Sequence, residues 1–304
     1  MIVDLVKLAR PKQWSKSVFV LIGPLYGFAA GQSVDWRSVA FAVLAFALAS
    51  SGCYIVNDIR DADADRAHPR KKHRPIASGA VAPKLGAMAA LVIFAAGGAA
   101  AAFGVNPAVA LPTCLWLGLY VLNVTLYSVG LKHVVVLDVI SLASGFVLRV
   151  LAGCAAAGVE PSTWLLNSTL FVSMFLAFGK RLGERRTMGA EVSAVRAVQS
   201  TYTDDLLRMV VVVTGVACLV TYAGYVQAQA ERYTAHVFGA WGFNLLWMTV
   251  LPATYGLLRC IVQVERGIYD DPTELASRDR PFQVAVAAFA GLTLLAMWAA
   301  GHRG

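Results

Sequence analysis

Long runs of apolar residues alternate with short polar, glycine-containing or proline-containing breaks along the whole chain. Several runs approach or exceed the roughly 18–20 residues that a helix needs to cross a bilayer. Glycine, proline and charged residues mark nearly all of the breaks, and no spacer is long or flexible enough to separate two domains. Nine spanning helices are predicted, at residues 15–31, 38–57, 84–104, 107–129, 134–157, 162–179, 207–228, 236–259 and 281–301. The pattern predicts an all-α, polytopic membrane bundle that forms a single domain over residues 1–304.

The composition agrees with this pattern. Of the 304 residues, 58% are hydrophobic and only 14% are charged, whereas a soluble domain carries about 25% charged residues. The first ten residues lack the long apolar core and the small-residue cleavage site of a signal peptide, so we expect the N-terminus to be retained. The five cysteines lie in or at the ends of apolar runs without a CxxC spacing, which predicts structural thiols rather than a zinc site or a disulfide framework.

The basic residues are distributed very unevenly between the two sides of the predicted membrane. Twenty-two of the 26 lysine and arginine residues fall on one side, three fall on the other, and Arg149 lies inside a helix. The positive-inside rule then places the N-terminus in the cytoplasm and the C-terminus outside. Three long charged loops follow the second, sixth and eighth predicted helices, all on the cytoplasmic side. The sequence therefore predicts a multi-pass protein of the inner (plasma) membrane whose active site faces the cytoplasm.

The most unusual polar stretch is NDIRDADADRAHPRKKHRPIASG, residues 57–79, directly after the second predicted span. If that helix continues past Asn57, then Asp58, Asp61 and Asp65 share one face, because they are spaced i, i+3 and i+7. Three like charges on one face near a membrane are costly unless a cation neutralises them. Carboxylate oxygens suit Mg²⁺, which completes its shell with water and substrate phosphate.

A dense group of cations follows these acids, and phosphate or diphosphate is the substrate group that requires both Mg²⁺ and cations. An alternative is a solvated loop that obeys the positive-inside rule, which explains the cations but not the regular spacing of the acids. The cations are Arg66, Arg70, Lys71, Lys72 and Arg74.

The motif NDIRDADADR matches the NDxxDxxxD signature of the UbiA superfamily of intramembrane prenyltransferases, and the helix number and loop placement resemble that family too. The resemblance implies a nine-helix bundle with a cytoplasm-facing or interfacial site, in which aspartate motifs hold Mg²⁺ and a diphosphate. Ordinary members carry a second, DxxxD-like motif after the sixth helix, where this chain has FGKRLGERR. Cations in place of carboxylates indicate a site that binds more negative charge.

Several segments together resemble one branch of the superfamily, the decaprenyl-phosphate phosphoribosyltransferases: RPKQWSK, the 57–79 stretch, YSVGLKH, FGKRLGE and DPTELASRDRP. The resemblance implies transfer of 5-phosphoribosyl from 5-phosphoribosyl 1-diphosphate (PRPP) to decaprenyl or another polyprenyl phosphate, with release of diphosphate. Such a reaction belongs to the synthesis of decaprenylphosphoryl-arabinose for the cell wall. Its acceptor oxygen is already anionic, so no general base is needed, and Mg²⁺ neutralises the leaving group.

The resemblance also implies roles for individual residues. The catalytic residues are Asp58, Asp61 and Asp65, and the metal-binding set adds Asn57 and Glu184 to them. The donor-binding set is Asn57, Arg66, Lys71, Lys72, Arg74, Tyr127, Lys132, Lys180, Arg181 and Glu184. Lys12, Gln13 and Lys16 are expected to meet the lipid phosphate. An interfacial anchor with Trp14 in the aromatic belt is the alternative for that last segment, and an interfacial aromatic is the alternative for Tyr127.

Other polar residues leave alternatives open. Arg149 lies in mid-helix, where it either lines a cavity or pairs with another helix. The segment DDPTELASRDRP is predicted to cap a helix and lock a loop rather than to form a second acidic motif. His68 and His73 are expected to contact solvent or phosphate rather than a metal.

Two other functions compete with phosphoribosyl transfer. They are prenyl transfer to an aromatic acceptor, disfavoured by the missing DxxxD, and transport of anionic metabolites, disfavoured because no inverted repeat is evident. The lipid bilayer is an expected partner, nucleic acid is not, and the choice between a monomer and a homo-oligomer is left open.

Overall fold

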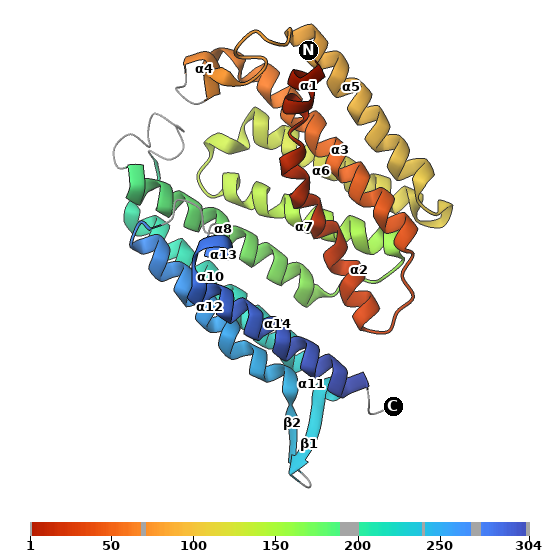
Figure 1. The fold of residues 1–304 in the computed structure, drawn as a ribbon, viewed down its shortest axis with the longest axis vertical. Helices are drawn as coiled ribbons and strands as arrows, with labels where there is room; N and C mark the ends of the chain where they lie inside the picture. The colour runs from red at the N-terminus through yellow and green to blue at the C-terminus, as the bar shows by residue number, and fades with distance from the viewer. Residues whose placement is uncertain (1, 68–70, 189–200, 239–240, 269–274, 302–304) are drawn as a thin grey trace. The chain divides into compact units, whose positions relative to one another are not determined.

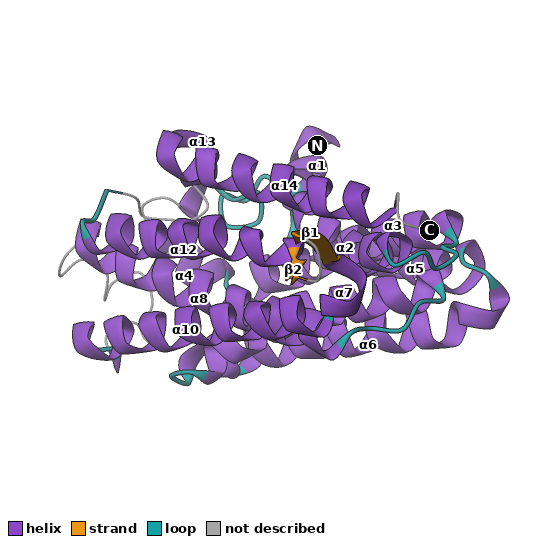
Figure 2. Cartoon of the chain, turned by 90° about the horizontal axis from the view of Figure 1, so that it is seen from below, coloured by secondary structure: helices purple, strands orange, loops and turns teal. Residues whose placement is uncertain are grey.

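The structure is a computed structural model that describes residues 2–67, 71–188, 201–238, 241–268 and 275–301. Nearly all of these residues are helical, and the only strands among them form one antiparallel hairpin (Figure 2). The chain divides into two compact units, Met1–Lys132 with Ser144–Pro161, and His133–Ala143 with Ser162–Gly304. The helix α7 (Leu137–Ala157) begins in the second unit and ends in the first.

The first unit contains most of the residues that the sequence marks as functional. Its helices are α1 (Ile2–Ala9), η1 (Pro11–Val18), α2 (Phe19–Ala29), α3 (Trp36–Arg60), α4 (Ala62–Ala67), η2 (Lys71–His73), α5 (Pro83–Ala99), η3 (Ala100–Gly104), α6 (Pro107–Val129) and η4 (Leu131–His133, whose last residue falls in the second unit). α3 is the more buried of two neighbouring helices and lies beside α5 (Figure 1). Small residues permit this close packing, since a Cβ added at Gly97 would lie 3.2 Å from the carbonyl oxygen of Ala45.

α3 is positioned at both of its ends. Asp35 caps its first turn, because the carboxylate accepts hydrogen bonds from the backbone N–H (3.1 Å) and the hydroxyl (2.7 Å) of Ser38. Near the other end, Ile55 packs in a buried cluster with Leu8 of α1 and Ile76. This cluster ties the N-terminal helix and the segment 74–81 to the part of α3 that carries the acidic residues.

The second unit contains α8 (Thr163–Met188), α10 (Asp204–Ala228), α11 (Ala230–Tyr233), η6 (Leu245–Thr249), α12 (Val250–Glu265), α13 (Leu275–Arg278) and α14 (Arg280–Gly301). The hairpin of β1 (Thr234–Phe238) and β2 (Trp241–Asn244) projects from the end of this unit (Figure 1). A buried cluster that includes Phe178, Leu207 and Val264 holds α8, α10 and α12 together.

Within the described residues, seven helical segments are long and apolar enough to cross a membrane, and each falls on one of the nine predicted spans. Segment 15–31 is a 3-10 helix followed by an α-helix of only 11 residues, and segment 162–179 lies in the more polar helix α8. The chain is therefore a helical membrane protein, while the count of nine spans stays a prediction. The largest boundary error is at the eighth predicted span: it was placed from 236 but begins only at Leu245, because the residues before it, which include Phe238, Trp241 and Phe243, form the hairpin.

Candidate active site

Two acidic side chains of the segment 57–67 are buried together although they are ionisable. α3 ends one residue before Asp61 (φ −89°, ψ 8°), and α4 follows directly. Backbone hydrogen bonds from Asp61 N to Asn57 O (2.9 Å) and from Asp65 N to Asp61 O (2.8 Å) continue the helical pattern across the junction. Asp58 and Asp65 consequently stay on one side and are only 2% and 3% exposed. The spacing predicted one face for Asp58, Asp61 and Asp65 together, and the structure groups only the first and the last of them, because Asp61 is half-buried and meets other partners.

Arg74 joins these two carboxylates. Its Nη1 donates to Oδ1 of Asp58 at 3.1 Å and to Oδ2 of Asp65 at 2.6 Å. The η2 turn before it presents Arg74 in this direction, with a backbone bond of 2.9 Å from Arg74 N to Lys71 O. Nζ of Lys71 lies 4.0 Å from the other oxygen of Asp65. Two of the seven cations predicted to bind the donor, Arg74 and Lys71, therefore meet the buried acids.

Arg10 is a member of this site that sequence reasoning missed. Its Nη2 lies 2.5 Å from the same Oδ1 of Asp58, and its guanidinium lies over the ring of Tyr54, 5.1 Å from the centroid. Arg10 has left-handed backbone angles (φ 51°, ψ 59°) between α1 and η1, which are unusual for a residue other than glycine. The available sequence signal was an arginine at a helix break before Pro11, but no local spacing relates it to a residue 48 positions away.

Asp61 points to different partners. Nζ of Lys132 lies 3.1 Å from both of its oxygens, and Nδ2 of Asn57 donates to Oδ2 at 3.1 Å. The structure thus brings the predicted residues Asn57, Asp61 and Lys132 together, next to the Asp58–Asp65 pair along the chain.

Other predicted residues of the first unit lie outside these contacts. Arg66 pairs with the exposed Asp63 at 2.5 Å and donates to the carbonyl of Ala77 at 3.4 Å. Lys72 is exposed and Tyr127 is half-buried. Arg70 and His68 lie outside the described residues, and His73 is exposed.

The segment predicted to meet the lipid phosphate forms η1 on the surface of α3. Lys12 and Lys16 are exposed and Gln13 is half-buried. Nε1 of Trp14 donates to Oγ of Ser51 at 2.9 Å, so this segment is attached to α3 two turns before the acidic residues. Trp14 is therefore more than an interfacial anchor, although its side chain remains partly exposed.

Asp58 and Asp65 offer ligand atoms that fit Mg²⁺. Both supply carboxylate oxygens. The two carboxylates also lie close together, since one nitrogen of Arg74 reaches both. Mg²⁺ commonly takes one or two carboxylates and completes its shell with water and substrate phosphate. Among the described residues, no group of three carboxylate, histidine or cysteine side chains is close enough to hold a metal. The larger ligand set that includes Asp61 and Glu184 stays a prediction.

In the second unit, the predicted residue Arg181 is 2% exposed and forms an ion pair with the buried Asp138. The hydroxyl of Tyr202 donates to Oδ1 of Asp138 at 2.7 Å and accepts from the backbone N–H of Val136. Burial raises the pKa of Tyr202 to about 12, so the hydroxyl stays a donor at physiological pH. Val136 has φ 70°, a strained angle for a β-branched residue.

The remaining candidates of the second unit have mixed positions. Lys180 and Glu184 are half-buried on α8. Asp279 accepts hydrogen bonds from Arg259 and Gln263 of α12 and from the backbone N–H of Phe282 at the start of α14. The predicted helix cap and loop lock is therefore confirmed for Asp279, whereas the acids at 270, 271 and 274 lie outside the described residues.

Arg149 is 4% exposed and contacts neutral groups of two other helices. Its Nη2 donates to Oγ of Ser50 (3.1 Å) and to the hydroxyl of Tyr120 (2.7 Å), and its Nη1 donates to the carbonyl of Gly145. The guanidinium also lies 4.4 Å from the centroid of the Tyr120 ring. It makes no ion pair within the described part of the chain, and these contacts favour pairing with other helices.

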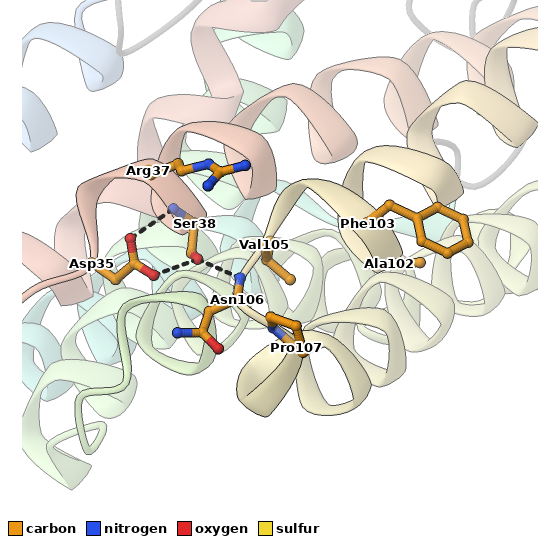
Figure 3. A pocket seen from close by; sticks show the side chains of 8 residues that line it. All are labelled: Asp35, Arg37, Ser38, Ala102, Phe103, Val105, Asn106 and Pro107. Carbon is orange, nitrogen blue, oxygen red and sulfur yellow. Dashed lines mark hydrogen bonds between the residues drawn. The ribbon is translucent and has the colours of Figure 1, made fainter.

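An open pocket of about 570 Å³ lies at the opposite end of α3 from the buried acids (Figure 3). Hydrogen bonds from Ser38 hold the pKa of Asp35 below its usual value, and the Ser38 hydroxyl accepts from the backbone N–H of Asn106 at 2.7 Å. Asp35 and Ser38 are thus occupied with helix caps and chain packing. None of the predicted site residues lines this pocket, whose lining is Asp35, Arg37, Ser38, Ala102, Phe103, Val105, Asn106 and Pro107.

Comparison with known proteins supports the membrane-enzyme interpretation. The model of the UbiA prenyltransferase family matches residues 17–276. The decaprenyl-phosphate phosphoribosyltransferase of Mycolicibacterium smegmatis is 33% identical over 94% of this chain and 90% of the relative. The protein of that name from Corynebacterium glutamicum is 34% identical over 97% of this chain and 86% of the relative.

A solved structure agrees in fold. The UbiA homolog from Archaeoglobus fulgidus bound to GPP and Mg²⁺ aligns with 97% of this chain and 99% of that chain, at a TM-score of 0.68 and 15% identity. At this low identity the likeness concerns the fold alone.

Proposed function

The chain belongs to the UbiA prenyltransferase family, and we propose that it transfers 5-phosphoribosyl from PRPP to decaprenyl or another polyprenyl phosphate and releases diphosphate. The observation that carries this proposal is the pair of buried carboxylates, Asp58 and Asp65, surrounded by Arg10, Arg74 and Lys71. The similarity to named decaprenyl-phosphate phosphoribosyltransferases over nearly the whole chain supports it.

Asp58 and Asp65 hold Mg²⁺ together with the donor diphosphate in this proposal. When bound, Mg²⁺ supplies charge neutralisation of the leaving diphosphate. Arg74 and Lys71 donate to diphosphate oxygens, since guanidinium and ammonium groups form strong charge-assisted bonds with phosphate. As the bond to diphosphate breaks, positive charge develops at the ribosyl carbon, and the acceptor phosphate oxygen attacks that carbon. The acceptor oxygen is already anionic, so no side chain has to remove a proton.

Lys132 orients Asp61, because its ammonium contacts both carboxylate oxygens. Tyr127, Lys72 and Arg66 are further donor contacts in the proposal, as are Lys180, Arg181 and Glu184 of α8. Lys12, Gln13 and Lys16 receive the lipid phosphate. This assignment is supported by the bond that attaches η1 to α3 at Ser51.

The proposal includes the placement of the protein. The two units act as one domain with nine spans in the inner (plasma) membrane, the N-terminus and the acidic segment lie on the cytoplasmic side, and the C-terminus lies outside. The excess of basic residues on one side supports this orientation. A soluble donor reaches the site from the cytoplasm, while the polyprenyl chain remains in the bilayer.

The test is a transfer assay with purified full-length protein, radiolabelled PRPP, Mg²⁺ and decaprenyl phosphate. We expect Mg²⁺-dependent label in the organic phase, and loss of that label in Asp58→Asn. Asp63→Asn is the matched control, because Asp63 lies in the same segment but is 95% exposed and pairs only with Arg66 among the described residues. Absence of label, with activity on a prenyl diphosphate and an aromatic acceptor, would show that the protein is instead an ordinary prenyltransferase.

A further inference from the structure

One carboxylate oxygen in the site receives two guanidinium groups. Oδ1 of Asp58 lies 2.5 Å from Nη2 of Arg10 and 3.1 Å from Nη1 of Arg74. The same Nη1 lies 2.6 Å from Oδ2 of Asp65. A divalent cation bound between the two carboxylates would lie beside the guanidinium nitrogen that now reaches both of them, so the arginines and the metal compete for the same two acidic groups.

The balance of charges around the site also indicates that the side-chain cations compete with a metal ion. Three carboxylates, those of Asp58, Asp61 and Asp65, have four cationic partners within 4.0 Å: Arg10, Arg74, Lys71 and Lys132. The acids are thus already neutralised by side chains, and a metal ion arriving alone adds repulsion among cations. A metal that arrives with a diphosphate brings compensating negative charge and gives the arginines new partners.

We propose that Arg10 and Arg74 are exchangeable counter-ions: they neutralise Asp58 and Asp65 before the donor binds, and they move onto the donor diphosphate as Mg²⁺ takes the carboxylate oxygens. The inference rests on the proposed function, because it concerns the same metal and diphosphate site. It assigns a role to Arg10, for which the sequence predicted none although it begins the segment RPKQWSK, and it predicts that metal and diphosphate bind cooperatively.

The two arginines are suited to this exchange. Guanidinium groups bind phosphate oxygens in bidentate geometry and remain charged at all physiological pH values. Each of the two side chains is partly exposed while Asp58 is buried, so each can turn toward a ligand from the solvent side. Before the donor binds, the left-handed backbone of Arg10 and the ring of Tyr54 position the Arg10 guanidinium beside Asp58. Such backbone strain is common at functional sites.

Equilibrium dialysis of the full chain in detergent measures this coupling directly. Mn²⁺ is the probe for the metal and inorganic diphosphate the probe for the donor, and excess Mn²⁺ in the protein compartment reports binding. For the wild type we expect weak binding of Mn²⁺ alone and binding that is about 5- to 150-fold tighter with diphosphate, the usual range of coupling between ligands.

Arg74→Gln should bind Mn²⁺ alone more tightly than the wild type does, and diphosphate should add less. Arg10→Gln should show the same change to a smaller degree, because Arg10 contacts only one of the two carboxylates. Arg74→Lys keeps the charge and should keep weak binding of Mn²⁺ alone. Arg60→Gln is the matched control, since exposed Arg60 in the same segment donates to the carbonyl of Val129 instead. A monodisperse elution profile confirms that each variant is folded.

Two results would overturn the inference and leave the proposed function standing. In one, the wild type binds Mn²⁺ equally well with and without diphosphate. In the other, the wild type shows the coupling, but neither Arg74→Gln nor Arg10→Gln gains affinity for Mn²⁺ alone. Asp58→Asn should bind no Mn²⁺ even with diphosphate, because it lacks one of the two carboxylates. The same result for the wild type would overturn both the inference and the proposed metal site.

Discussion

Arg181 of α8 and Asp138 of α7 form an ion pair in which both side chains are almost fully buried. Tyr202 donates to the other oxygen of the same carboxylate. The ion pair neutralises the carboxylate of Asp138, which would be very costly to bury as an isolated charge. The guanidinium that the sequence marked as a donor contact is therefore also a structural partner of Asp138.

Arg181→Met should strongly destabilise the protein, because it leaves the buried charge of Asp138 without its positively charged partner. Loss of one member of a buried pair commonly costs about 3–5 kcal/mol of unfolding free energy. The measurement is thermal or denaturant unfolding in detergent. The double variant Asp138→Leu/Arg181→Met should recover much of the loss, since both charges are then absent. A double variant no more stable than the single one would contradict this explanation.

Arg149→Met should be milder than Arg181→Met, although both arginines are buried in helices. Arg149 has only neutral partners among the described residues, and two of them, Ser50 Oγ and Tyr120 OH, already lie 2.9 Å apart and can bond each other. No unpaired charge remains after the substitution, whereas Arg181→Met leaves one. Unfolding of the two variants under identical conditions tests the ranking. An equal or larger loss for Arg149→Met would point to a function in ligand binding.

The helices were largely predictable from the sequence, and the hairpin was not. The length of an apolar run is a local property, so the helices over 84–104, 107–129 and 281–301 could be located from hydropathy alone. The strands over 234–238 and 241–244 directly precede an apolar run, and a hydropathy window that covers both does not show where the strands end and the helix begins. Composition also could not show that residues 15–31 combine a 3-10 helix with a short α-helix.

For the site, the spacing of the acids predicted that Asp58 and Asp65 share a face, because helical periodicity relates residues seven apart. Their cationic partners were less accessible. Arg10 is 48 residues from Asp58, and Asp138 is 43 residues from Arg181. Such contacts depend on how helices pack, and a single sequence does not contain that information.

Stability should fall in acid partly because of Asp279. Hydrogen bonds, first from Arg259 and then from the backbone N–H of Phe282 and from Gln263, outweigh desolvation and hold its pKa below the usual value of 3.8. A lowered folded-state pKa stabilises the protein above the unfolded-state pKa, and this contribution is lost as the pH falls through 3.8 toward the folded-state value. Unfolding of the wild type and of Asp279→Asn between about pH 3 and pH 7 checks this. The difference between them should be largest at neutral pH and shrink in acid, and a constant difference would rule out this titration as the cause.

Lys132 and Asp61 should contribute to turnover through the single contact between them. Nζ of Lys132 lies 3.1 Å from both carboxylate oxygens, so either substitution, Lys132→Met or Asp61→Asn, removes the same charged hydrogen bond. Such bonds contribute about 1.5–3 kcal/mol, which corresponds to a loss of about 10- to 150-fold in kcat/KM for the donor.

The double variant should lose little more than the more severe single variant, because residues in one interaction are not additive. Lys84→Met is the matched control: Lys84 is an exposed cation near the start of α5 and should leave kcat/KM unchanged. Strictly additive losses in the double variant would mean that Lys132 and Asp61 serve the reaction separately, with Lys132 binding a donor phosphate rather than orienting the carboxylate.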